Sequence, residues 1–284
     1  MVIPTYNRAG WLVEAVQSVI RQSYQDFEIV VADHGSTDDT AARLRALEAP
    51  LRVVKLEQTG RPEFAMNRAV EAAHGELIAF LYDDDQWAPD YLAKQVATLE
   101  GDPANGFAYC DVRFLAPDGS ISTPRMRREH KAADRALEHL LGECFICSSA
   151  LVLPRWAYEQ AGRMDERFSP HGEYALLLRL AASTQAACTP EPLVVIRRHP
   201  AGLSSQNEAL NYQNAIRILE HFGETTRLSV RRRMLLRASL SKYYTHVGLL
   251  HQRQGDPEGA RRRLLHALRL NPLRRRAWVG LLGK

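Results

Sequence analysis

The nine residues LIAFLYDDD, 77–85, carry the strongest indication of the fold. Residues 77–81 are all apolar and have the length of a buried strand. Asp83, Asp84 and Asp85 follow, and their charges repel one another at a strand end unless they share a cation. Such a triplet alone would more often be a solvated acidic loop, but the buried strand before it and a second acidic strand end favour a site.

Strand and helix signals alternate upstream of this stretch. We predict strands at 2–4, 27–32, 51–56 and 77–81 and helices at 9–22, 40–47 and 63–73. This order predicts an α/β fold with a mostly parallel central sheet that helices flank on both faces. In such sheets ligands bind beyond the carboxyl ends of the strands. The polar segments 5–7, 33–34 and 83–85 all fall at those ends.

Composition narrows the class of protein. The chain has 284 residues, of which 45% are hydrophobic and 25% charged, as in globular proteins of one or two domains. No run approaches the about 18 consecutive apolar residues of a membrane span, so an integral membrane protein is excluded. Four cysteines make no disulfide framework and no secretory signal is visible, so we expect a cytoplasmic protein.

Charge divides the chain into two unequal parts. Residues 1–227 contain 23 Lys and Arg against 31 Asp and Glu, whereas residues 228–284 contain 14 against two. We expect one domain over 1–205 and an all-α C-terminal region over 206–284. The basic region is most simply a set of solvated helix faces, with peripheral contact to anionic lipid at the inner membrane face as the alternative. Little aromatic interleaving disfavours nucleic acid.

Residues 241–272 have the spacing of one tetratricopeptide-like helical hairpin that turns at residues 255–256. With Pro272 as the last signature position, the other favoured positions hold Tyr244, Gly248, Gly255, Ala260, Leu264 and Ala267. One unit cannot bury its own apolar face, so it must pack on the rest of the chain or on another subunit of a homo-oligomer. An unrelated helical hairpin stays open as the alternative.

Three ordered motifs resemble family 2 glycosyltransferases of the GT-A fold. They are VIPTYNR at 2–8, EIVVADHGSTDDT at 28–40 and LYDDDQW at 81–87, and the likeness covers about residues 1–205. The resemblance implies a nucleotide-sugar donor, a divalent metal (Mg2+ or Mn2+) and inversion at the anomeric centre. We expect UDP-hexose as the donor and, by family analogy alone, a glycan or lipid-linked saccharide as the acceptor.

The resemblance also implies roles for individual residues. It assigns nucleotide binding to Pro4, Thr5, Tyr6, Asp33, His34, Arg61 and Asp83. It assigns the metal to Asp84 and Asp83, with Asp85 and His199 as further ligands. Trp87, next to the Asp triplet, is expected either to pack in the core or to contact the donor or acceptor.

Inverting transfer needs a carboxylate that takes the proton of the acceptor hydroxyl. Residues 165–174, DERFSPHGEY, resemble the acidic motif of the family, commonly Glu-Asp-Tyr, at the start of a helix. On this resemblance Glu173 is the base, at a position where Asp is usual. A helix N-terminus favours the charged form of such a carboxylate, although ordinary N-terminal helix charge is the alternative reading.

Three residues depart from the family pattern. His34 replaces an Asp or Asn, although a neutral His nitrogen can still accept a proton from a pyrimidine N–H. Tyr82 replaces the first Asp of the metal motif, and Glu173 replaces Asp. These departures leave open a catalytically weak, nucleotide-binding scaffold or regulator with a partner-binding basic tail. A nucleotidyltransferase is disfavoured because residues 5–10, TYNRAG, make a poor phosphate loop.

Overall fold

The N-terminal sheet consists of three parallel strands. They are β1 (Val2–Thr5), β2 (Ile29–Asp33) and β3 (Leu51–Lys55), in the spatial order β1-β2-β3. Val2 and Val30 contribute to one hydrophobic cluster, and Ile3 and Val31 contribute to another. Alternate residues of a strand point to opposite faces, so this distribution means that both faces are covered. β1 and β2 are accordingly almost uninterrupted apolar runs, whereas the edge strand β3 also carries Arg52 and Lys55.

A computed structural model provides these coordinates and describes residues 1–126, 132–200, 202 and 208–282. The second sheet consists of β4 (Leu77–Ala79), β5 (Gln86–Trp87), β6 (Asn105–Leu115), β7 (Leu151–Pro154) and β8 (Gln185–Arg197) in the order β4-β7-β6-β8-β5. A parallel bridge between Val2 and Phe80 links it to the first sheet. β6 and β8 are parallel, whereas the other pairs are antiparallel. The α/β prediction is confirmed, with the parallel strands concentrated in the N-terminal sheet.

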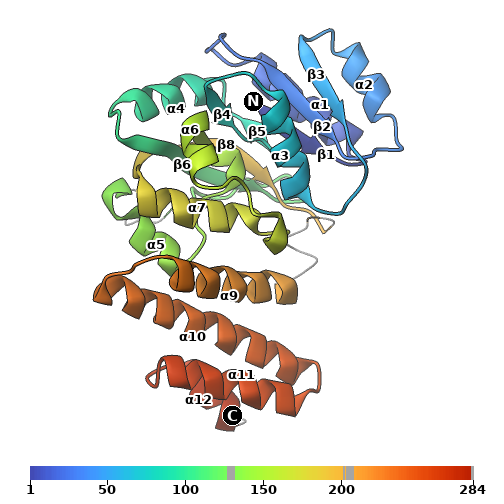
Figure 1. Cartoon of the computed structure of the whole chain (residues 1–284). Helices are drawn as coiled ribbons and strands as arrows, with labels where there is room; N and C mark the ends of the chain where they lie inside the picture. The colour runs from blue at the N-terminus through green and yellow to red at the C-terminus, as the bar shows by residue number, and fades with distance from the viewer. Residues whose placement is uncertain (127–131, 201, 203–207, 283–284) are drawn as a thin grey trace.

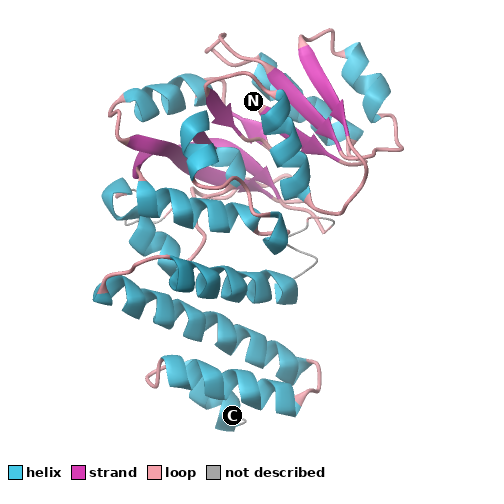
Figure 2. Cartoon of the chain, in the orientation of Figure 1, coloured by secondary structure: helices cyan, strands magenta, loops and turns pink. Residues whose placement is uncertain are grey.

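Helices cover both faces of the layer that the two linked sheets form (Figures 1 and 2). They are α1 (Ala9–Ile20), α2 (Thr40–Ala46), α3 (Pro62–Ala72), α4 (Tyr91–Glu100), α5 (Ala136–Gly142), α6 (Arg155–Gln160) and α7 (Gly172–Ser183). α3 packs on β1 and β2, and α4 packs on β6 and β8. Gly172, the first residue of α7, lies against Glu63 in the first turn of α3, so the N-termini of these two helices meet.

Four further helices stack below α7 in chain order (Figure 1). They are α9 (Glu208–Thr225), α10 (Val230–Arg253), α11 (Pro257–Leu270) and α12 (Arg275–Leu282). The larger hydrophobic cluster continues from Tyr109 in β6 through Leu177 in α7 to Leu219, Leu240 and Leu264 in this stack. The C-terminal helices therefore share a core with the sheet-containing part. The domain boundary expected at 205/206 falls outside the described residues.

Helices α10 and α11 form an antiparallel pair that turns at Gly255, whose φ is +76°. Asp256 accepts a hydrogen bond from the Gly259 N–H at 2.8 Å and so caps α11. A Cβ on Gly248 would lie 2.8 Å from Cγ of Leu264, which is why the two helices can approach so closely only with glycine there. The assignment of this pair to the tetratricopeptide type stays a proposal.

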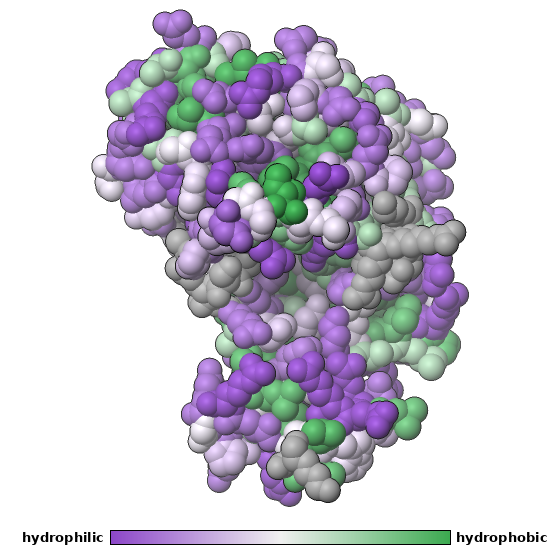
Figure 3. Space-filling model, turned by 180° about the vertical axis from the view of Figure 1, so that it is seen from behind, coloured by the Kyte–Doolittle hydropathy of each residue, from purple (hydrophilic) through white to green (hydrophobic). Residues whose placement is uncertain are grey.

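The surface of the C-terminal helices combines hydrophilic areas with smaller hydrophobic patches (Figure 3). Exposed arginines occur on α10, α11 and α12, among them Arg231, Arg262 and Arg275. Within the described part of the chain, no helix is both long and apolar enough to span a membrane.

Candidate functional site

The strand register brings the predicted polar strand ends together. Thr5 is paired with Asp33 at the carboxyl ends of β1 and β2. The Val2–Phe80 bridge places the Asp triplet beside the same edge, and the hydroxyl of Thr5 donates a hydrogen bond to Oδ2 of Asp83 at 2.8 Å. Asp33 is buried and accepts a hydrogen bond from the Ser36 N–H at 2.9 Å. The expected meeting of three strand ends is thus observed.

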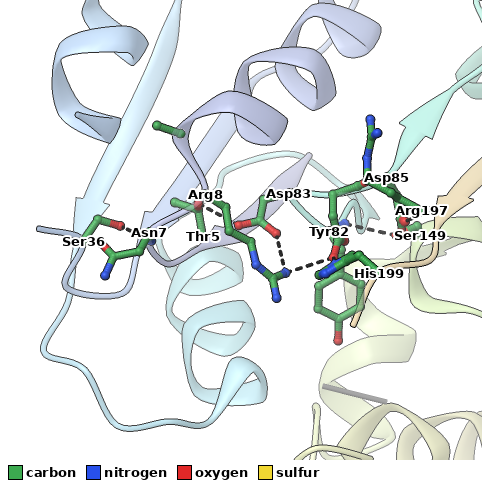
Figure 4. A network of polar contacts seen from close by, with 12 residues as sticks. Thr5, Asn7, Arg8, Ser36, Tyr82, Asp83, Asp85, Ser149, Arg197 and His199 are labelled. Carbon is green, nitrogen blue, oxygen red and sulfur yellow. Dashed lines mark hydrogen bonds and ion pairs between the residues drawn. The ribbon is translucent and has the colours of Figure 1, made fainter. Parts of the chain in front are cut away.

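Arg8 bridges two of the three clustered carboxylates (Figure 4). Its Nη1 lies 3.2 Å from Oδ1 of Asp83 and 2.9 Å from Oδ2 of Asp84. Burial and the charge of Asp84 raise the pKa of Asp83 to about 7, and Arg8 opposes this rise. Sequence reasoning missed Arg8, although the residue ends the first family-like motif.

His199 lies just beyond β8 and meets the same carboxylate of Asp84. Its Nε2 is 2.9 Å from Oδ2 of Asp84, and its ring packs 4.3 Å from the ring of Trp11. The predicted approach of His199 to the Asp triplet is therefore observed.

Asp85 points away from Asp83, toward Ser149 and Arg197 (Figure 4). Its carboxylate accepts hydrogen bonds from the Ser149 hydroxyl at 2.5 Å and from the Arg197 N–H at 3.2 Å. Burial and then the charge of Asp84 raise its pKa well above the ordinary value. This geometry does not support Asp85 as a metal ligand; the residue instead ties the Asp triplet to β8.

Asp84 and His199 are a suitable donor pair for a divalent cation. Their 2.9 Å separation matches the spacing of two adjacent ligands that each lie about 2.1 Å from an octahedral ion. Over residues 1–126, 132–200, 202 and 208–282, no three His, Cys, Asp or Glu side chains form a preformed metal cage. Mg2+ commonly takes one or two protein ligands and completes its shell with water and substrate phosphates. The residues therefore fit a cation that binds together with a diphosphate.

His34 is held by the segment that follows β3. Its Nε2 accepts a hydrogen bond from the Thr59 N–H at 3.0 Å and lies 3.0 Å from the Thr59 hydroxyl. Burial lowers the pKa of His34 and so favours the neutral ring. The expectation that His34 accepts a pyrimidine N–H is wrong for Nε2, because Thr59 already occupies this nitrogen.

The remaining candidates for nucleotide binding differ in accessibility. Pro4 is buried within β1, whereas Tyr6 is 42% exposed directly after it and Arg61 is exposed just before α3. Asn7, which sequence reasoning missed, has a φ of +51° and joins the first two strand-end loops. Its Oδ1 accepts a hydrogen bond from the Thr37 N–H at 2.7 Å. Tyr6 thus precedes a loop arrangement that Asn7 holds in place.

Trp87 belongs to the core. Its side chain is buried, donates a hydrogen bond from Nε1 to the carbonyl of Ser149 at 2.7 Å, and stacks on Tyr91 with 4.2 Å between ring centroids. The prediction that Trp87 contacts donor or acceptor is therefore wrong, because the side chain is buried, its indole N–H is bonded and its ring stacks on Tyr91 inside the protein.

Glu173 lies in the first turn of α7. Its Oε1 is 3.6 Å from Nδ1 of His171. Its Oε2 is buried and has no hydrogen-bond partner among the described residues. A buried carboxylate oxygen without a partner is rare in proteins, and it is available to accept a proton.

Glu63 is a second buried carboxylate beside Glu173 and was not predicted. It comes from α3, and its Oε1 accepts a hydrogen bond from the Gly172 N–H at 3.0 Å. A Cβ on Gly172 would lie 2.5 Å from Cγ of Glu63, so Glu63 fills the space that a side chain at 172 would need. Burial and the charge of Glu173 raise the pKa of Glu63 to about 6. No local pattern could reveal this contact, because it joins residues 109 apart.

Tyr82 connects the two groups of carboxylates. Burial, followed by the charges of Glu173, Glu63 and Asp84, raises its pKa well above the ordinary value. Its phenol is therefore within electrostatic reach of both the Asp84–His199 pair and the Glu173–Glu63 pair.

Known proteins share this arrangement of elements. The family model described as Glycosyl transferase family 2 matches residues 1–155. The amylovoran biosynthesis glycosyltransferase AmsB of Erwinia amylovora is 28% identical over 192 residues, which are 63% of this chain and 62% of AmsB. The chain spans only 17% to 64% of the length of four other curated relatives.

Two solved structures have the same fold. S. aureus TarS in complex with UDP-GlcNAc matches with a TM-score of 0.77 at 15% identity, over 99% of this chain and 87% of TarS. The mannosyltransferase PcManGT of Pyrobaculum calidifontis, in complex with GDP-Man and Mn2+, matches with a TM-score of 0.68 at 20% identity, over 99% of this chain and 78% of PcManGT. At these identities the likeness shows the fold.

Proposed function

The chain belongs to glycosyl transferase family 2, and on that premise we propose that it transfers a hexose from a nucleotide-sugar donor to a saccharide hydroxyl with inversion at the anomeric carbon. One observation carries the proposal: Asp84 meets His199 beside the carboxyl ends of the first strands, and Glu173 at the start of α7 keeps a buried oxygen without a partner among the described residues. A diphosphate bound at the first pair would leave its sugar near the second group.

The donor site in this proposal occupies the carboxyl ends of β1 and β2. Asp83, oriented by Thr5 and Arg8, faces the nucleotide, while Asp84 and His199 hold Mg2+ or Mn2+. When bound, the cation neutralises negative charge on the leaving diphosphate. TarS binds UDP-GlcNAc and PcManGT binds GDP-Man and Mn2+, which supports a nucleotide-sugar and a divalent cation here. UDP-hexose is the proposed donor.

Glu173 is the proposed base. Its Oε2 has no partner among the described residues and so is available for the proton of the acceptor hydroxyl. Glu63 packs beside it, and burial and the charge of Glu173 raise the pKa of Glu63 itself. His171, 3.6 Å from Oε1, restricts where the carboxylate can turn.

The acceptor is proposed to be a glycan or lipid-linked saccharide at the cytoplasmic membrane face. AmsB is named for the biosynthesis of the polysaccharide amylovoran, which supports this class. The exposed arginines of α10 to α12 suit peripheral contact with anionic lipid. We also propose two domains, over residues 1–205 and 206–284. The second contains the tetratricopeptide-like hairpin, and its helices mediate self-association.

Nucleotide release from a panel of UDP-glucose, UDP-GlcNAc and GDP-mannose with Mn2+ tests this function. We expect slow hydrolysis of at least one donor, release of the sugar with inverted anomeric configuration by NMR, and loss of both in Asp84→Ala. Binding of UDP without turnover of any donor would instead support the scaffold alternative, which the departures at His34, Tyr82 and Glu173 favour.

A further inference from the structure

A groove with a volume of about 320 Å³ lies where α7 meets the C-terminal helices. Residues from α7, α9 and α10 line it, among them His171, Tyr174, Tyr212, Lys242, Tyr243 and His246. The volume is at the lower end of the about 300–1,000 Å³ of small-ligand sites. Seen from behind, the molecular surface is hollowed where the sheet-containing part and these helices meet (Figure 3).

One wall of this groove is aromatic. The rings of Tyr212 and His246 are stacked, with centroids 4.9 Å apart and an interplanar angle of 20°, and Tyr243 lies 6.1 Å from Tyr212. Tyr and His combine an apolar ring face with a polar edge. A pyranose ring has the complementary surface, since one face exposes C–H groups and its rim carries hydroxyls.

The polar groups of the groove are held in place. Lys242 donates a hydrogen bond to the carbonyl of Gly142 at 2.9 Å and lies 5.0 Å from the ring of Tyr243. The hydroxyl of Tyr212 donates to Oε1 of Glu208 at 3.1 Å, which fixes the ring on α9. Such preorganisation reduces the entropy that a ligand loses on binding.

The groove adjoins the proposed base. His171 lines it, and Nδ1 of His171 is 3.6 Å from Oε1 of Glu173. A saccharide in the groove would therefore have a hydroxyl beside the carboxylate that must take its proton.

We propose that this groove binds the acceptor saccharide, with one sugar ring packed against the Tyr212–His246 stack and a hydroxyl directed past His171 to Glu173. The inference rests on the proposed function and adds to it that the C-terminal helices form part of the acceptor site. The catalytic part alone would then lack one wall of this site.

Saturation-transfer NMR on the full chain with UDP and Mn2+ tests the groove, with the methyl α- and β-glycosides of glucose, galactose, mannose and N-acetylglucosamine as probes. We expect at least one glycoside to bind, and Tyr212→Ala to weaken it about tenfold, the effect of losing an aromatic platform. Tyr212→Phe keeps the ring without the hydroxyl that bonds Glu208 and is expected to bind more tightly than Tyr212→Ala. His246→Ala removes the other ring of the stack and should also weaken glycoside binding.

The same samples separate this inference from the proposed function. The affinity for UDP, measured by calorimetry, reports the donor site, so failure of the unmodified chain to bind UDP would contradict the function itself. If UDP binds and no glycoside binds even at its solubility limit, the groove is not the acceptor site. Equal glycoside affinities for Tyr212→Ala, His246→Ala and the parent would overturn the inference as well.

Discussion

His199 and Asp84 are 115 residues apart in the chain, yet Nε2 of His199 lies 2.9 Å from Oδ2 of Asp84. The contact forms because β8 ends beside the Asp triplet, where the Arg197 N–H donates to Asp85. One carboxylate thus secures the end of β8 while its neighbour meets the imidazole that follows. The two adjacent aspartates therefore make different contacts: Asp85 bonds to the backbone of β8, and Asp84 bonds to His199.

Removal of the Asp84 carboxylate should greatly weaken cation binding. Because substitution of groups that merely support metal ligands costs about 10–100-fold, Asp84→Asn should weaken Mn2+ binding in the presence of UDP at least about 100-fold. Donor hydrolysis should fall in parallel. Electron paramagnetic resonance of free Mn2+ during titration measures the affinity. His199→Gln should have a smaller effect in the same direction.

Asp26→Asn is the matched control for this pair, because Asp26 is exposed in the loop before β2, at the opposite end of the strand. It should bind Mn2+ and UDP as the parent does. Unaltered Mn2+ affinity in Asp84→Asn would place the cation elsewhere.

Glu173→Gln should remove the base while keeping the size of the side chain. We expect transfer to fall by about 10²–10⁴, the usual contribution of general base catalysis, with little change in the affinity for UDP. Steady-state kinetics and calorimetry measure the two quantities. Glu173→Asp should retain part of the activity, because Asp keeps the charge but ends one methylene earlier.

The exposed residue Glu224, near the end of α9, provides the control for this substitution as Glu224→Gln. The assignment of the base would have to be abandoned if Glu173→Gln transferred sugar as fast as Glu224→Gln.

Glu63→Gln should change the pH dependence of stability. The fold raises the pKa of Glu63 from 4.5 to about 6, so it favours the protonated form. The stabilisation is complete below pH 4.5 and is lost as the pH rises through about 6. Gln cannot ionise and keeps an acceptor for the Gly172 N–H. Relative to the parent, the variant should therefore gain about 2 kcal/mol of unfolding free energy between acidic and alkaline pH.

Urea unfolding at pH values on either side of this window measures the difference. If the difference in unfolding free energy between Glu63→Gln and the parent were the same at both pH values, the fold would not raise the pKa of Glu63. Glu224→Gln should show no such dependence, since Glu224 is exposed.

Gly248→Ala and Gly10→Ala should have opposite effects on stability. Both glycines are in helices, where Ala is favoured by up to about 1 kcal/mol. A Cβ on Gly10 meets nothing within 4 Å, whereas one on Gly248 lies 2.8 Å from Cγ of the fully buried Leu264. Overpacking costs about 1–3 kcal/mol, so Gly248→Ala should lower the melting temperature and Gly10→Ala should raise it. A higher melting temperature in both variants would show that α10 and α11 can move apart without loss of stability.

Local patterns were sufficient to predict most of the elements and the meeting of the strand ends. The apolar run at 77–81 and the polar residues after it indicated where Asp83 would lie, because a parallel sheet places all such ends at one edge. The N-terminal position of Glu173 on α7 could also be predicted, since a helix start has a local signature.

The direction of individual side chains could not be predicted in the same way. Asp84 and Asp85 are neighbours of the same type, and only the docking of β8 turns Asp85 toward Ser149 and leaves Asp84 for His199. Trp87 likewise enters the core because Tyr91 and the Ser149 carbonyl lie there to receive it.

The sequence by itself determined which segments are strands and helices and which strand ends carry charge, because periodicity and turn chemistry act over a few neighbouring residues. Only the tertiary structure decided that Arg8 would join two aspartates and that Glu63 would stand beside Glu173. These contacts depend on how segments distant in the chain dock against one another, and the energy of a buried charge is set by the partners that docking supplies.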